Sequence, residues 1–287
     1  MEKRLKLGPP FWSGLILIAS QTFALYVAFR EKDFVEANQI IPPQIPLGAP
    51  LVYFFGAVIL LGVILFLVPI YILRIALRIM FTFLFSWGMF IVLGLTLPIL
   101  VASLISVAGG LMWLFIPRVW LHNLLMIFTL VSVGSVFGFL LSPWTAISFM
   151  VVISIYDILA VRFGYMLWLA KKLSESETLP AFVIPRRISS WNLNLKQAGF
   201  KKLFEDSSAE REFSILGGGD IGFPLLLVVS VFFAYGFTSS VIVAVFSLLG
   251  LISAYWIQLF FLKGKPMPAL PPIFFVSLIG FLILYLI

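Results

Sequence analysis

The chain has 287 residues, of which 62% are hydrophobic and only 11% are charged, and its mean hydropathy is +1.15. Because a soluble domain needs more polar surface than this, the composition predicts an integral membrane protein in a lipid bilayer. The net charge of +7 does not indicate a nucleic-acid partner, since the basic residues cluster in short connectors between apolar runs. The absence of cysteine excludes disulfides, thiolate metal sites and a cysteine nucleophile.

Apolar runs of roughly 20 residues predict transmembrane helices. In chain order they cover residues 11–29, 51–73, 120–141, 144–168, 221–236, 239–262 and 269–287. The uncharged stretch 79–117 is about twice the length of one crossing and predicts two further helices that reverse near Pro98. No small-residue cleavage pattern follows the first run, so it is interpreted as a retained helix and not as a signal peptide. The predicted fold class is all-α with nine transmembrane helices.

The positions of lysine and arginine predict how these helices are oriented. If the N-terminus is cytoplasmic, sixteen of the 19 basic residues fall in cytoplasmic segments and only Arg30 and Lys32 fall outside, while Arg162 lies in the predicted span 144–168. A count of eight or ten helices would mix these two sets. We therefore predict a cytoplasmic N-terminus and a C-terminus on the outer side.

The same reading divides the chain into three parts. Residues 1–170 form a six-helix part, residues 171–216 form a polar, flexible cytoplasmic linker, and residues 217–287 form a three-helix part. The first outer loop, 31–50, contains four prolines and is predicted to be irregular.

Two acidic residues have no aqueous segment to occupy. Of the 12 aspartates and glutamates, ten fall in the N-terminus or in loops, whereas Asp157 and Asp220 fall inside or at the edge of apolar helices. An ionisable group in the hydrocarbon region costs at least about 2.5 to 3.5 kcal/mol, so it marks a functional site or a polar contact between helices. Both aspartates are expected a turn or two inside the cytoplasmic face, where water can reach them.

Paired carboxylates suggest one reaction. Two carboxyl groups a few ångströms apart share a single proton, so one can activate water while the other polarises a carbonyl. This is the chemistry of an aspartic protease, which needs neither metal nor cofactor.

Two irregular backbone segments accompany the aspartates. Gly217, Gly218 and Gly219 directly precede Asp220, which weakens the first helical turn and lets another backbone approach closely. An unwound substrate needs such an exposed backbone with which to pair. The second segment, 266–272, contains four prolines, more than a helix cap requires, and predicts irregular backbone that lines a cavity.

These segments resemble motifs of the presenilin and signal peptide peptidase family of intramembrane aspartyl proteases. Tyr156-Asp157 resembles the Tyr-Asp motif of that family's sixth helix, Gly217 to Asp220 its Gly-x-Gly-Asp motif on the seventh, and Pro268-Ala269-Leu270 its Pro-Ala-Leu motif on the ninth. Each motif is short, but the three occur in the right order. They also fall on the sixth, seventh and ninth of the helices whose number the charge distribution supports.

The resemblance implies a set of roles and partners. Asp157 and Asp220 would be catalytic, while Tyr156, Gly217, Gly218, Gly219, Pro268, Ala269 and Leu270 would shape the site and engage substrate. The substrates would be transmembrane helices of other membrane proteins. The flanking residues and the inside N-terminus resemble presenilin more than signal peptide peptidase, and the short linker suits a prokaryotic or archaeal homologue in the cell membrane. Such a protein is expected to act alone or as a homo-oligomer, without obligate accessory subunits.

Other membrane-protein classes fit less well. A zinc protease needs His-Glu-x-x-His, but His122 is the chain's single histidine and is interpreted as an interface residue at a helix end. A rhomboid-like serine protease would have to pair His122 with Ser135, which lacks a suitable glycine motif. Prepilin peptidases share Gly-x-Gly-Asp but not the other two motifs. A proton-coupled transporter or channel remains the alternative, because paired acids also relay protons.

Overall fold

The computed structural model describes residues 8–40, 45–176, 178–195, 213–262 and 267–284. The protein is largely helical. Its helices and strands are α1 (Pro9–Ala37), α2 (Gly48–Leu67), α3 (Ile70–Gly94), α4 (Ile99–Phe115), α5 (Val119–Leu140), α6 (Pro143–Arg162), α7 (Tyr165–Glu175), β1 (Ala181–Pro185), the 3₁₀ helix η1 (Ile188–Asn192), β2 (Phe213–Gly217), α9 (Gly218–Phe260) and α10 (Leu270–Ile283).

Six of the described helices are long and apolar enough to cross a membrane, namely α1, α2, α3, α5, α6 and α9. The helices α4 and α10 are apolar but shorter. The long α9 is interrupted at Gly236, where φ is +85° and ψ is −179°. This residue separates the two apolar runs that the sequence predicted as 221–236 and 239–262, because a left-handed φ ends regular helix and is readily adopted by glycine.

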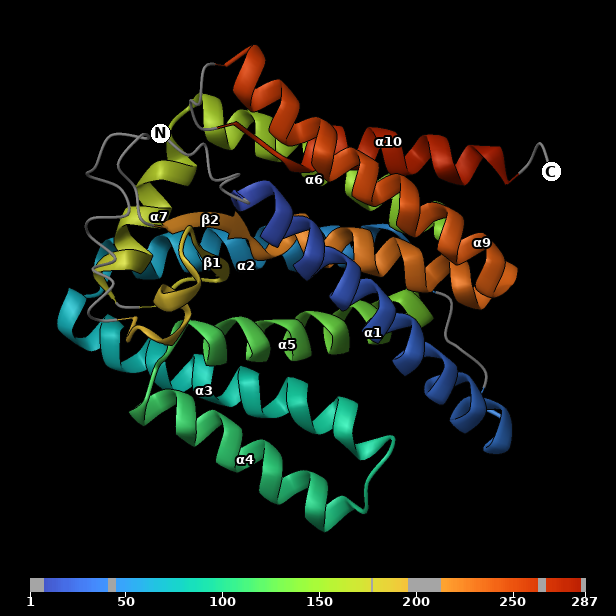
Figure 1. Ribbon diagram of the computed structural model, residues 1–287, viewed down its shortest axis with the longest axis horizontal. Coiled ribbons are helices and arrows are strands. Elements are labelled where there is room, and N and C mark those ends of the chain that lie inside the picture. The colour runs from blue at the N-terminus through green and yellow to red at the C-terminus, as the bar shows by residue number, and fades with distance from the viewer. Residues whose placement is uncertain (1–7, 41–44, 177, 196–212, 263–266, 285–287) are drawn as a thin grey trace, which may run out of the picture.

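The helices pack around α5 and the first part of α9. The helix α5 contacts α1, α3 and α9, while α10 lies against α6 and α9. Figure 1 shows α6, α10 and the second part of α9 on one side of this core and the α3–α4 pair on the other. Glycines allow some of these close approaches, as a Cβ at Gly88 of α3 would lie 2.6 Å from Thr129 Cα on α5.

Three predicted helix boundaries were wrong. The predicted span 144–168 is divided, because α6 ends at Arg162 and Gly164, with φ +73°, precedes the start of α7 at Tyr165. The helix α1 continues through Glu31 to Ala37, so the acidic start of the predicted outer loop is helical. The predicted span 51–73 is divided, because Pro69 has no N–H and Val68 before it is extended, with φ −86° and ψ 131°. Arg74 therefore lies in the first turns of α3, where its Nη2 donates to the Glu175 carbonyl at 3.1 Å.

The all-α prediction requires one correction, a two-stranded antiparallel sheet. β1 pairs with β2 in a register that joins Ala181 to Gly217 and Pro185 to Phe213. β1, and β2 except for its last residue Gly217, lie inside the predicted flexible linker. Strand β1 is buried at all five positions, and its Val183 packs with Val119 and Leu195 in a small second core beneath the sheet.

Further backbone pairing holds this part of the chain to the helices. Val119 N–H donates to the Leu193 carbonyl at 3.1 Å, and Leu195 N–H donates to the Pro117 carbonyl at 2.8 Å. Figure 1 shows α7, β1 and β2 together at one end of the helices. The segment that the composition marks as polar linker thus forms, in its described part, a structured cap on the bundle.

Candidate active site

Asp157 projects from the interior of a regular helix. The helix α6 begins at Pro143, and its N-cap Ser142 accepts a hydrogen bond from Thr145 N–H at 3.2 Å. Asp157 lies four turns along this helix and is 7% exposed. Its carboxylate accepts a hydrogen bond from the backbone N–H of Leu270, the first residue of α10. The position of Asp157 therefore depends on regular helix geometry and on one contact with another helix.

Asp220 is held at the junction between a strand and a helix. β2 ends at Gly217, which is also the N-cap of α9, so Asp220 is the third residue of that helix. Its carboxylate turns back and accepts the N–H of Gly217, as the acidic residue of a capping box does. A Cβ at Gly217 would lie 3.0 Å from Asp220 Oδ2, so glycine leaves room for this turn.

The two aspartates are 63 positions apart in the sequence but lie close enough in the fold to interact electrostatically. The helices that carry them are in contact, and α10, which contacts the Asp157 carboxylate, packs on both. The three segments that the sequence singled out therefore meet at one site.

The other glycines of the motif have different neighbours. Gly218 is buried, its N–H donates to the Pro180 carbonyl at 3.1 Å, and a Cβ there would lie 2.9 Å from that same oxygen. Gly219 is exposed, and its Cβ would meet only the ring of Phe223, at 3.1 Å. The close backbone approach predicted for this run occurs at Gly218, where the neighbour is the chain's own segment before β1.

The predicted irregular backbone of 266–272 is found at 267–269, whereas 270–272 belong to α10, so the prediction was wrong there. Pro268 and Ala269 are non-helical and half-buried, and Leu270 is 3% exposed. Pro271 and Pro272 occupy early helix positions that tolerate proline. Pro266, also part of the predicted segment, lies outside the described residues.

An aromatic cluster connects the two aspartate-bearing helices with α2. The Phe149 and Phe223 rings lie 5.8 Å apart, and Phe54 of α2 lies 5.8 Å from Phe149 and 6.0 Å from Tyr156. Tyr156, next to Asp157 in the sequence, thus belongs to this aromatic cluster. The sequence could not single out Phe54, Phe149 or Phe223, because they are three among 31 phenylalanines.

Tyr255, in the second half of α9, was also missed by the sequence reasoning. Its hydroxyl lies 2.5 Å from Ser13 Oγ on α1, and it interacts electrostatically with Asp220. No sequence motif marks it, because its place near the aspartate depends on how α1 and the two halves of α9 pack.

The interpretation of His122 as an interface residue was wrong. His122 is 1% exposed, packs against Phe85 and Trp113, and its Nε2 lies 2.9 Å from the Ala181 carbonyl oxygen. The helix end that carries it is covered by β1, so the residue lies in the protein interior.

The next residue, Asn123, pairs with the same strand. Asn123 Nδ2 donates to the Val183 carbonyl at 2.8 Å, and Asn123 Oδ1 accepts from Val183 N–H at 3.0 Å. In an antiparallel strand the N–H and C=O of one residue point to the same side. Val183 therefore directs both groups away from β2, and its partner Ile215 directs both groups away from β1.

Parity along the strands then assigns their edges. The outward groups of β1 meet the side chains of His122 and Asn123. In the part of the chain that the structure describes, no hydrogen bond reaches the outward N–H and C=O of Ile215. Among the described residues, the edge of β2 that continues to Gly217 and Asp220 is therefore unpaired.

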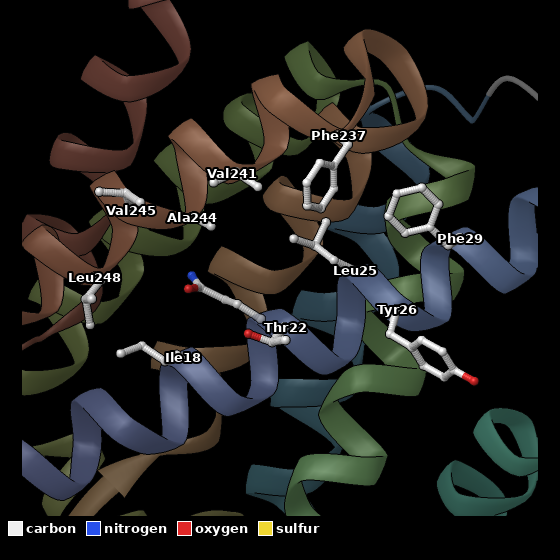
Figure 2. Close-up of a pocket in the computed structure, with 11 residues that line it drawn as sticks. Ile18, Thr22, Leu25, Tyr26, Phe29, Phe237, Val241, Ala244, Val245 and Leu248 are labelled. Atoms are coloured by element: carbon white, nitrogen blue, oxygen red, sulfur yellow. The ribbon is translucent and has the colours of Figure 1, made fainter.

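An open cavity lies away from the aspartates. It has a volume of about 430 Å³ and lies between α1 and the second half of α9, lined by residues such as Thr22, Phe29 and Val245 (Figure 2). None of the motif residues lines it. Among the described residues there is also no cluster of three histidine or acidic side chains that could hold a metal ion.

Comparisons with known proteins identify the class. The sequence model of the family described as signal-peptide peptidase, presenilin aspartyl protease matches residues 14–287. The chain therefore belongs to the presenilin and signal peptide peptidase family of aspartyl proteases. It is an intramembrane protease and an integral, multi-pass membrane protein whose substrates lie in the bilayer.

Two solved structures show the same fold. One is described as a presenilin family intramembrane aspartate protease in a C222 crystal, with 20% identity, a TM-score of 0.64, and coverage of 96% of this chain and 98% of the other. The other is described in the same words in a P2 crystal, with 20% identity, a TM-score of 0.58 and 96% coverage of both chains. No curated protein matched the chain in a sequence search.

Proposed function

We propose that the protein is an endopeptidase that hydrolyses peptide bonds within transmembrane segments, with Asp157 and Asp220 as its catalytic pair. One carboxylate removes a proton from water, which attacks the scissile carbonyl carbon, while the protonated partner donates to the carbonyl oxygen. The carboxyl that took the proton from water then gives it to the leaving nitrogen, while its partner removes a proton from a hydroxyl of the resulting gem-diol. The C–N bond breaks and releases an amine and a carboxylic acid, with the two aspartates back in their starting state. The neighbouring helices exclude bulk water and thus strengthen these polar interactions.

One observation carries this proposal. The aspartates are electrostatically coupled, and each carboxylate also accepts a backbone N–H, one from Leu270 and the other from Gly217. These N–H groups fix both side chains without providing another acidic or basic group. Neither contact supplies a group that could take up the proton, which supports the proposal that the two carboxyl groups share it, as general acid and base catalysis requires.

The open edge of β2 supports a mode of substrate binding. A transmembrane helix hides its peptide bonds in internal hydrogen bonds, so a bond must be unwound before water can attack it. An unwound segment placed beside Ile215 would gain strand hydrogen bonds that replace those lost. Since Gly217 is two residues further, about 7 Å along the strand, the paired segment would run past Asp220.

The test compares the purified wild type with Asp157→Ala and Asp220→Ala in detergent, using a tagged single-pass membrane protein as substrate. Each variant is expected to lose about 10²-fold or more of the cleavage rate. The matched control is Asp33→Ala, which changes an exposed acid on the last turns of α1. Undiminished cleavage by either catalytic variant would refute the assignment.

Two further measurements follow from the same mechanism. A hydroxyl-containing transition-state analogue should block cleavage, because it resembles the tetrahedral intermediate. The pH profile of kcat/KM should be bell-shaped, because activity needs one carboxyl charged and the other protonated. A simple sigmoidal profile would contradict a shared proton.

The proposed topology has nine transmembrane helices, with the N-terminus in the cytoplasm, the C-terminus outside and the three-part division at 170 and 216. The contact of Arg74 with α7 supports it, because this contact brings an arginine assigned to the inside next to the linker. The proposed setting is a prokaryotic cell membrane, where the protein acts alone or as a homo-oligomer without obligate subunits. Reporter fusions at both ends would test the orientation, and light scattering of the purified active enzyme would test the oligomeric state.

The transporter alternative gains no support from the comparisons, which indicate proteases. No residue of the site requires a transport function, so the transporter is not a second candidate function.

A further inference from the structure

A side chain on α5 takes the place of a neighbouring strand for β1. Asn123 is 3% exposed and forms two hydrogen bonds with the N–H and C=O of Val183, at 3.0 Å and 2.8 Å. A primary amide presents one donor and one acceptor side by side, so it can satisfy both outward groups of a strand residue. His122 adds a contact with the Ala181 carbonyl, two residues earlier on the same edge.

The sheet connects the hydrogen bonds of Asn123 with the position of Asp220. β1 fixes β2 through the register that joins Val183 with Ile215 and Ala181 with Gly217. The Gly218 N–H, bonded to the Pro180 carbonyl, continues the ladder into the first turn of α9. Since the Gly217 N–H in turn contacts the Asp220 carboxylate, a displacement of β1 would move both Asp220 and the edge of β2.

The contacts of Asn123 and His122 with β1 also determine which edge of the sheet is open. A two-stranded sheet has two edges at which an extended chain can add. The side chains of Asn123 and His122 occupy the edge of β1, so an added strand is directed to Ile215 on the other side, next to Asp220. These two side chains of α5 therefore influence the edge at which a substrate pairs.

We propose that Asn123 is a positioning residue that fixes the register between a paired substrate and Asp220, and so selects the peptide bond that is cleaved. This inference rests on the proposed function. It goes further because it assigns the choice of cleavage position to a residue of α5 outside the three motifs, which acts through its hydrogen bonds with Val183.

The experiment compares the cleavage products of wild type, Asn123→Ala and Asn123→Asp on one tagged single-pass substrate, by mass spectrometry. Asn123→Ala removes both hydrogen bonds with Val183, so cleavage is expected to spread over neighbouring peptide bonds of the substrate. We also expect kcat to fall about tenfold. For this comparison kcat is calculated per active enzyme molecule, counted by the binding of a transition-state analogue. Asn123→Asp keeps the size of the side chain and its acceptor for Val183 N–H. Its ionised carboxylate faces the Val183 carbonyl, so it should also spread the products, and acidification should narrow them as the protonated carboxyl regains a donor.

The matched control is Ser132→Ala on the same helix. Ser132 is 1% exposed, and its Oγ donates to the Thr129 carbonyl of its own helix at 2.9 Å. It should leave the product distribution unchanged, even if thermal unfolding shows a small loss of stability.

Each outcome has one meaning. An unchanged distribution of products in Asn123→Asp overturns the inference, even if turnover falls, because a purely structural role changes the amount of active enzyme and not the bond it cleaves. If Asn123→Ala cannot be purified folded, Asn123→Asp decides alone. Absence of cleavage by the wild type, or full cleavage by Asp220→Ala, would instead refute the proposed function.

Discussion

The two aspartates of the site are held in different ways. Asp157 lies within an ordinary helix and is joined to the rest of the site by one hydrogen bond from Leu270. Asp220 lies where a strand becomes a helix, and its place depends on Gly217, Gly218 and the pairing of β1 with β2. The backbone around Asp157 should therefore tolerate substitution, whereas added atoms near Asp220 should displace it.

The strongest test of this difference is Gly218→Ala. The new Cβ would lie 2.9 Å from the Pro180 carbonyl oxygen, closer than real Cβ atoms approach, and the contact is with backbone that cannot rotate away. The first turn of α9 must then move relative to β1. A displacement of about 1 Å can cost about 10²-fold in rate, so kcat/KM should fall by about that factor.

Gly222→Ala is the matched control, measured with the same substrate. Its Cβ would meet only Leu130 Cδ2, at 3.2 Å, and this methyl group can move. Alanine there should also favour the helix by several tenths of a kcal/mol. Equal activities of the two variants would show that the contact between Gly218 and Pro180 does not control the site.

Gly217→Ala should have the next largest effect. The backbone at Gly217 has φ −58° and ψ 139°, which alanine adopts readily, so the fold should be kept. The new methyl group would lie 3.0 Å from Asp220 Oδ2 and should push the carboxylate from the Gly217 N–H. We expect kcat to fall about tenfold, since 1.4 kcal/mol of lost orientation gives this factor.

Steady-state kinetics and thermal unfolding separate the possible outcomes for this variant. A raised KM with unchanged kcat would contradict an effect on the carboxylate and indicate a role in substrate binding instead. A large drop in the unfolding temperature would show that the glycine serves the fold.

Leu270 provides the corresponding test on the side of Asp157. Leu270→Ala keeps the N–H but removes a buried side chain, which should cost about 2 to 5 kcal/mol of stability. Leu270→Pro removes the N–H as well, at a helix position where proline is tolerated. The proline variant should have a kcat about three- to tenfold below that of the alanine variant, because the Asp157 carboxylate loses a donor.

The informative quantity is the ratio of the two kcat values, since both variants lose the leucine side chain. A ratio near one would show that the N–H of Leu270 contributes nothing to catalysis.

The smallest effect on activity is expected for Gly236→Ala. Gly236 has φ +85°, a conformation that costs an alanine about 1 to 2 kcal/mol, although nothing lies within 4 Å of the new Cβ. It is sixteen residues beyond Asp220, about 24 Å if the helix were continuous. Thermal unfolding should therefore register the change while the cleavage rate stays within about twofold of wild type. A large loss of activity would show that the kink of α9 acts on the site.

Local patterns in the sequence predicted much of the fold. Hydropathy is a property of consecutive residues, so the apolar runs located the helices, and Pro98 and Gly236 marked the predicted interruptions. The same argument misplaced the boundary at Pro69, because the apolar run continues through it without a polar residue. It also missed β1 and β2, which are short, lie in a polar segment and pair with each other across the intervening chain.

The candidate site shows the same division. The motifs around Asp157, Asp220 and Leu270 were found because acids and prolines are costly in membrane helices. By contrast, Phe223, Tyr255 and Asn123 carry no such cost and resemble many other residues of the chain. Their relevance follows from contacts with segments distant in sequence, such as the hydrogen bonds between Asn123 and Val183.

The sequence by itself thus determined the membrane class, the helical runs and the two aspartates, because each depends on the cost of placing particular residues in lipid. Only the tertiary structure decided what holds those aspartates in place. The strand β2, which continues directly into α9 and pairs with β1, fixes Asp220, and a backbone N–H from α10 fixes Asp157. The side-chain amide of Asn123 on α5 occupies the edge of β1. Hydrogen bonds between distant backbone groups leave no periodic signal in a sequence, which is why these contacts appear only in the folded chain.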